Sequence, residues 1–98
     1  METNLELIPY DSAEHFVDAD AQAELLNDAL ESGDPVYIKH ALNLVARARG
    51  MTEVARETGI KRQALYRALS PAGNPTLETL TKLLSALGLA MSVRNKAA

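Results

Sequence analysis

The chain has 98 residues, of which 47% are hydrophobic and only 4% aromatic. This length fits a single domain, and its core must be built from aliphatic side chains, as is typical of packed helices. The absence of cysteine excludes disulfide bonds and thiolate metal sites. The sequence also lacks a signal-peptide pattern and any apolar run near the roughly 20 residues that span a bilayer. We therefore expect a cytoplasmic protein.

The formal net charge of −3 conceals an uneven distribution. Residues 1–38 contain ten Asp/Glu and no Lys/Arg, whereas residues 39–98 contain ten Lys/Arg and three Asp/Glu, a net of +7. This asymmetry predicts two surfaces with different partners. We divide one compact unit accordingly, into an acidic segment over 1–34 and a basic unit over 35–98. An acidic helix that is simply solvated is the alternative interpretation of the first segment.

The N-terminal third predicts one clear helix. Residues 4–8 alternate weakly like a strand, and Ser12 can cap a short helical turn over 13–16. Asp18 then caps a helix that runs to about Ser32, with small and aliphatic residues on one face and carboxylates mostly on the other.

A second helix opens at Asp34 and Pro35, because a capping carboxylate followed by proline is typical of a helix start. It runs to about Arg49, and Gly50 ends it.

Two short helices are predicted next, over about 52–58 with Thr52 as cap and over about 62–69, separated at Gly59. A turn-rich loop follows over 70–75. Thr76 can then cap a last helix, which carries a leucine stripe to Leu87.

Gly88 ends the last helix. Beyond it, Leu89–Val93 alternates apolar and polar residues, which predicts a short strand. Its partner would be residues 4–8 or the same strand of a second subunit. The whole pattern predicts an all-α fold of five to six helices with this short C-terminal strand.

Residues 52–69 fit a helix-turn-helix. Two helices that cross closely need a small residue at the contact, which Ala55 supplies, and their turn needs a positive φ, which Gly59 supplies. The remaining requirement is a set of apolar residues that hold the pair against the core: Val54, Ile60, Leu65 and Leu69.

The second helix of this pair would lie in the major groove of DNA. Arginine can bridge two acceptors on guanine and glutamine can pair with adenine, so its outward side chains are the candidates for base reading: Lys61, Arg62, Gln63, Tyr66 and Arg67. Hydroxyls at helix starts, nearby arginines and the following loop are the candidates for phosphate contact: Arg47, Arg49, Thr52, Arg56, Asn74 and Thr76. An ordinary solvated face is the alternative interpretation.

Nothing in the sequence indicates catalysis or a cofactor. His15 and His40 are far apart in a chain without cysteine, which argues against a zinc site. The carboxylates form no recognisable catalytic pair, and the serines have no nucleophile signature. We expect a protein that is not an enzyme and holds no cofactor or metal.

Several segments together resemble the addiction-module antidote proteins, a family similar to HigA-type antitoxins and to the Cro and lambda-repressor class. The resemblance covers about residues 10–91. It is carried by Leu25–Glu31, Gly33–Pro35, Ala46–Thr52, Leu65–Ser70, Gly73–Pro75 and Ala86–Leu89.

The resemblance implies a lambda-repressor-like fold in a bacterial antitoxin that binds its own operator, represses its operon and neutralises a RelE-like toxin, an mRNA-cleaving ribonuclease. Such toxins are basic as a family, so the acidic helix could attract one by complementary charge. The candidate toxin-facing residues are Asp20, Glu24, Asp28 and Glu31.

We also expect a homodimer, because a single helix-turn-helix contacts little DNA and half-sites are read about 34 Å apart. The last helix and the Leu89–Val93 strand are the candidate contacts. Two alternatives stay open: a stand-alone phage-repressor-like regulator without a toxin, and a protein–protein adaptor without DNA binding.

Overall fold

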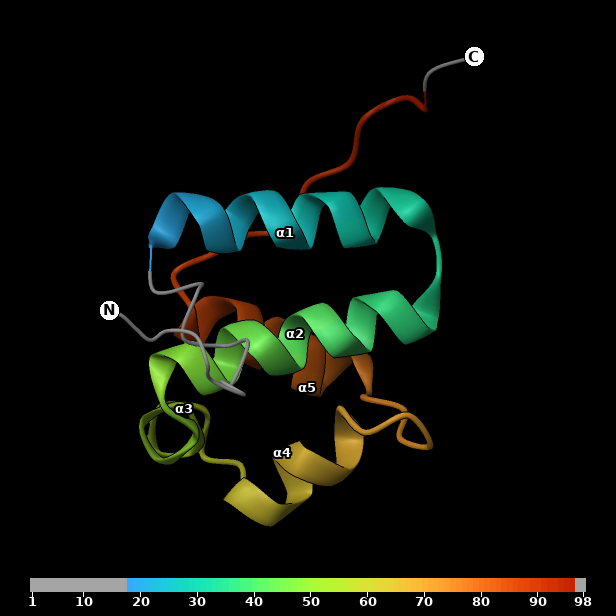
Figure 1. Ribbon diagram of the computed structural model, residues 1–98. Helices are drawn as coiled ribbons and strands as arrows, with labels where there is room; N and C mark the ends of the chain where they lie inside the picture. The colour runs from blue at the N-terminus through green and yellow to red at the C-terminus, as the bar shows by residue number, and fades with distance from the viewer. Residues whose placement is uncertain (1–17, 97–98) are drawn as a thin grey trace, which may run out of the picture.

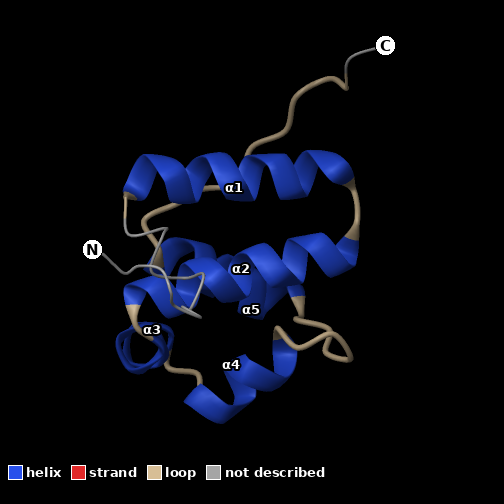
Figure 2. Cartoon of the chain, in the orientation of Figure 1, coloured by secondary structure: helices blue, strands red, loops and turns tan. Residues whose placement is uncertain are grey.

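The computed structural model describes residues 18–96, and all regular structure in that range is helical (Figures 1 and 2). The helices are α1 (Ala19–Ser32), α2 (Pro35–Arg49), α3 (Met51–Thr58), α4 (Arg62–Ala68) and α5 (Leu77–Ala86). The predicted all-helical fold is confirmed. The strand and the helical turn predicted before residue 18 lie outside the described residues.

The helices are arranged so that α1 and α4 lie at opposite ends of the molecule (Figure 1). α1 and α2 run antiparallel and pack against each other, and α3 contacts α2, α4 and α5. α4 touches the rest of the molecule largely through α3. This arrangement leaves one side of α4 uncovered within the described chain.

Three predicted helix caps are confirmed. The Asp18 carboxylate accepts a hydrogen bond from the amide of Asp20 at 2.8 Å. Asp34 accepts one from the amide of Val36 at 3.0 Å, and Thr76 Oγ1 accepts one from the amide of Thr79 at 3.1 Å. Each cap satisfies an amide that has no partner within its helix.

The predicted cap at Thr52 is wrong. Gly50 ends α2 and directly precedes α3, so α3 begins at Met51 and has no side-chain cap. Gly50 has φ of 102° and ψ of 112°, a conformation that is open to glycine and strongly disfavoured for other residues. One residue thus redirects the chain between two helices, which leaves the Thr52 hydroxyl available to a neighbour.

The core is aliphatic, as the composition predicts. Leu42, Leu65, Leu83 and Leu87 are each at most 2% exposed, and α1 adds Leu26 and Ala29. The apolar residues expected to hold the two short helices are in or against this core. Leu77, the first residue of the leucine stripe, is 70% exposed and lies outside it.

The predicted strand over Leu89–Val93 is not found. Leu89 packs against the core and its amide donates to the carbonyl of Leu84 at 2.8 Å, but residues 89–96 are irregular. A strand exists only by exchanging backbone hydrogen bonds with a neighbour, and the described part of this chain offers none. The tail instead passes α1, where Arg94 forms an ion pair with Glu31 (Figure 1).

Candidate nucleic-acid interface

The turn between α3 and α4 is built from Gly59, Ile60 and Lys61. Gly59 has φ of 75°, in the left-handed region, and its amide donates to the carbonyl of Ala55 at 2.9 Å. Thr58, which is buried, donates its hydroxyl to the carbonyl of Val54 at 2.8 Å and accepts the amide of Ile60 at 3.2 Å. The sequence pattern indicates Gly59 but not Thr58, because a threonine at the last position of a helix gives no signal of its own.

α4 carries four of the five predicted base-reading side chains, and all five are exposed. Arg62 and Tyr66 are four residues apart and so lie on one face of the helix, as do Gln63 and Arg67 on the adjacent face. Lys61 immediately precedes α4. Since α4 bears three basic residues with Lys61 included and no acidic one, this surface is positively charged.

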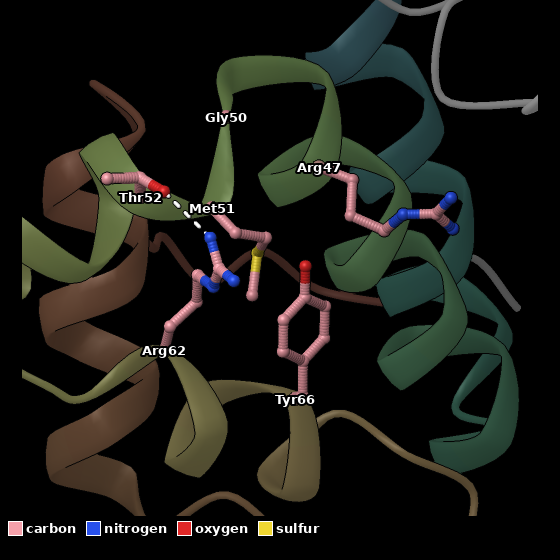
Figure 3. Close-up of a pocket in the computed structure, with 6 residues that line it drawn as sticks. All are labelled: Arg47, Gly50, Met51, Thr52, Arg62 and Tyr66. Atoms are coloured by element: carbon pink, nitrogen blue, oxygen red, sulfur yellow. Dashed lines mark hydrogen bonds between the residues drawn. The ribbon is translucent and has the colours of Figure 1, made fainter.

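A shallow depression lies between α4 and the junction of α2 with α3 (Figure 3). It is lined by Arg47, Gly50, Met51, Thr52, Arg62 and Tyr66. Arg62 Nη1 donates a hydrogen bond to Thr52 Oγ1 at 2.9 Å. Tyr66 and Arg62 both point from α4 toward this depression, whereas Arg47 lines its edge from α2 with its guanidinium directed away from both (Figure 3). Among residues 18–96, no acidic side chain lines the depression.

The predicted phosphate contacts do not all share this surface. Arg56 is paired with Glu53 on α3, and this carboxylate raises the pKa of Arg56 above its ordinary value. Asn74 is exposed in the loop after α4, while the Thr76 hydroxyl is used as a helix cap. Of the predicted phosphate contacts, Arg47 and Thr52 line the depression, and Thr52 accepts a hydrogen bond from Arg62.

Arg49 is turned toward the rest of the protein. Its Nε donates to Gln22 Oε1 at 3.0 Å and its Nη2 donates to the carbonyl of Leu87 at 2.7 Å. Gln22 is itself buried in α1, and Leu87 directly follows α5. Arg49 therefore links three helices, and we leave it out of the proposed interface.

The loop after α4 is held by a residue that the sequence analysis missed. Lys39 Nζ donates to the carbonyl oxygens of Pro71 and Gly73, at 2.9 and 2.8 Å. A Cβ on Gly73 would lie 1.9 Å from the carbonyl oxygen of Arg67, so only glycine permits this close approach. Lys39 and Gly73 together fix the path of the loop that follows α4 in the chain.

The four candidate toxin-facing carboxylates are exposed along α1. Asp28 accepts a hydrogen bond from the Tyr37 hydroxyl at 2.6 Å, which raises the pKa of Tyr37 because the carboxylate stabilises its protonated form. Glu31 pairs with Arg94. α1 contains no basic residue, so its solvent-facing side is acidic and lies at the end opposite α4 (Figure 1).

Residues 18–96 offer neither a metal-binding cluster nor a membrane-spanning helix. No group of three or more histidine or carboxylate side chains is gathered there as a metal site would require. No helix in this range has the length and apolar character needed to cross a lipid bilayer.

The fold and its surface define a small helical protein with a basic helix at one end and an acidic helix at the other. A family model described as "Probable addiction module antidote protein" matches residues 6–95. The chain belongs to this family, whose description implies an antitoxin that has a toxin as its partner.

A relative from Haemophilus influenzae is 40% identical over 89 residues, which is 91% of this chain and 92% of the relative. That relative is described only as an uncharacterized protein. No solved structure gives a significant match to the chain.

Proposed function

We propose that this antidote protein binds operator DNA through α3 and α4, represses its own operon and neutralises a RelE-like toxin. In this proposal α3 and α4 form a helix-turn-helix of the HigA and Cro type, and α4 is the recognition helix in the major groove. The protein acts by binding and not by catalysis, in the bacterial cytoplasm.

The observation that carries the DNA-binding proposal is the exposed, positively charged surface of α4. The helix is anchored by Leu65, which is fully buried, while Gln63 and Arg67 project to solvent beside it. Long hydrogen-bonding side chains on a rigid short helix match what reading of base edges requires. The turn at Gly59 holds the chain before α4, and the hydrogen bonds from Lys39 hold the loop after it.

The acidic side of α1 supports a separate surface for the toxin. Asp20 and Glu24 are exposed on α1, which lies at the end of the molecule opposite α4 (Figure 1). Charge complementarity would steer a basic ribonuclease to this side. The two binding surfaces would then not overlap, so one chain could hold DNA and toxin at once.

We also propose that the protein acts as a homodimer, because two recognition helices related by a twofold axis read both halves of a palindrome. Leu77 and the tail that contains Met91 and Val93 are exposed apolar surface for such a contact. Sedimentation of the full chain with and without operator DNA would report the assembly.

The test of DNA binding is a titration of the protein against a fragment from just upstream of its own gene. Tight, selective binding that weakens steeply with added salt would support the proposal, because phosphate contacts release counterions. Arg67→Ala should lower the affinity for this fragment, whereas Lys82→Ala on α5 should not. No binding at low salt would favour the adaptor alternative, and equal binding to unrelated DNA would contradict operator recognition.

The test of the toxin surface uses charge reversal on α1. Asp20→Lys with Glu24→Lys should weaken binding to the toxin encoded beside the gene and leave DNA binding intact. Glu78→Lys on α5 is the matched reversal outside α1. Unchanged toxin affinity would show that α1 is only a solvated face, and the absence of any neighbouring toxin gene would favour a stand-alone regulator.

A further inference from the structure

We infer that the depression between α4 and the α2–α3 junction is a clamp for one DNA phosphodiester, and that Arg62 belongs to this clamp. Arg62 would then contact the backbone and not a base, leaving base recognition on α4 to Gln63 and Arg67. This inference rests on the proposed DNA-binding function and divides its contacts into two kinds.

The division follows from the two faces of α4. Residues 62 and 66 are one helical turn apart, and residues 63 and 67 occupy the face about 100° further round. The first face is turned toward α3, since both Arg62 and Tyr66 line the depression (Figure 3). Gln63 and Arg67 are exposed and absent from its lining.

The hydrogen bond from Arg62 to Thr52 fixes where the guanidinium lies. At 2.9 Å, Nη1 is committed to a hydroxyl on α3, so the side chain is directed back across the gap between the helices. To reach a base edge ahead of α4, Arg62 would have to break this bond and leave the depression. The guanidinium has five N–H donors, so most remain for an anion while Thr52 keeps its hydrogen bond.

The other lining groups suit a phosphodiester. The Tyr66 hydroxyl points into the same space as the Arg62 guanidinium, and Arg47 lines the edge of the depression from α2 (Figure 3). A phosphodiester carries one negative charge and two anionic oxygens, which a planar guanidinium can bind in bidentate fashion. Within the part of the chain that the structure describes, no carboxylate lines the depression to repel it.

Phosphate contacts and base contacts have different experimental signatures. A phosphate contact strengthens binding to every sequence and contributes about one unit to the salt slope, whereas a base contact discriminates between sequences. We would measure affinity by fluorescence anisotropy for the upstream fragment and for a scrambled fragment of equal length and composition, across a range of salt.

We expect Arg62→Ala to weaken binding to both fragments by about the same factor, near tenfold, and to lower the salt slope by about 1. Thr52→Val should act in the same direction with a smaller effect. Arg67→Ala and Gln63→Ala should reduce the ratio of the two affinities by about tenfold. The inference is overturned if Arg62→Ala reduces this ratio while the affinity for scrambled DNA stays constant.

A second measurement tests the clamp without DNA. Inorganic phosphate, titrated at constant ionic strength against chloride, should shift the NMR signal of the Arg62 side-chain Nε–H group. Arg56, which is paired with Glu53, is the internal control. If phosphate moves both signals equally, the clamp is refuted. If the Arg62 signal shifts selectively but the wild-type protein binds no DNA, the anion site stands and the proposed function fails.

Discussion

Replacing Arg49 with alanine should destabilise the fold without weakening DNA binding. The Arg49 side chain joins α2 to buried Gln22 of α1 and to the carbonyl of Leu87 after α5. Its removal leaves two acceptors without this charged donor. These bonds connect α1 to the helices that carry the candidate interface, so their loss should be felt by the whole fold.

The size of the effect follows from the two hydrogen bonds. A hydrogen bond to a charged group contributes about 1.5–3 kcal/mol, and Arg49 is exposed in part, which places both bonds at the low end. We expect the free energy of unfolding to fall by about 2–3 kcal/mol, a large share of the roughly 5–15 kcal/mol typical of a domain. Arg49→Lys, which cannot bridge both acceptors, should lose about half as much.

Urea unfolding followed by circular dichroism measures this change. Arg56→Ala is the matched control, because its ion pair with Glu53 is exposed to solvent and should contribute little to stability. DNA affinity should be measured below the unfolding transition. If Arg49→Ala leaves stability within about 0.5 kcal/mol of wild type and lowers DNA affinity, Arg49 is a phosphate contact and our structural interpretation is wrong.

Three further substitutions test local features. Gly73→Ala should cost about 2–3 kcal/mol of unfolding free energy, since its Cβ would overlap a backbone oxygen of α4, whereas Asn74→Ala in the same exposed loop should change little; equal effects would contradict the close approach. Gly59→Ala should lower the free energy of unfolding by about 1–2 kcal/mol from the positive φ alone, because the space around Gly59 is open. Thermal unfolding measures this change, and an unchanged midpoint would contradict it. Asp34→Ala should remove the cap of α2 and about 1 kcal/mol; helicity and unfolding midpoint would check it, with Asp34→Asn as the variant that retains the cap.

Local sequence signals were sufficient for most of the fold. Asp18, Asp34 and Thr76 precede helices as side chains that can accept an amide, and each does so in the structure. The same local rule predicted a cap at Thr52, but this prediction is wrong. The helix begins one residue earlier, at Met51, because Gly50 adopts an unusual backbone conformation. A local pattern does not reveal whether Gly50 or Thr52, two positions apart, marks the start of the helix.

The candidate site was predictable in composition but not in connectivity. The exposed side chains of α4 followed from helical periodicity, since Leu65 and Leu69 fix which side is buried. The roles of Arg49 and Lys39 depend on acceptors 27 to 38 residues away in the sequence. Charge alone marked both as basic residues, and only the three-dimensional structure shows that their donors are used inside the protein.

The separation of acidic α1 from basic α4 also gives the molecule an electric dipole. A polyanion attracts one end of such a molecule and repels the other, so the encounter itself turns the protein before any contact forms. A protein with the same net charge of −3 spread evenly would be repelled in every orientation. The position of α1, far from α4 (Figure 1), therefore lets an acidic protein approach a polyanion with its basic end first.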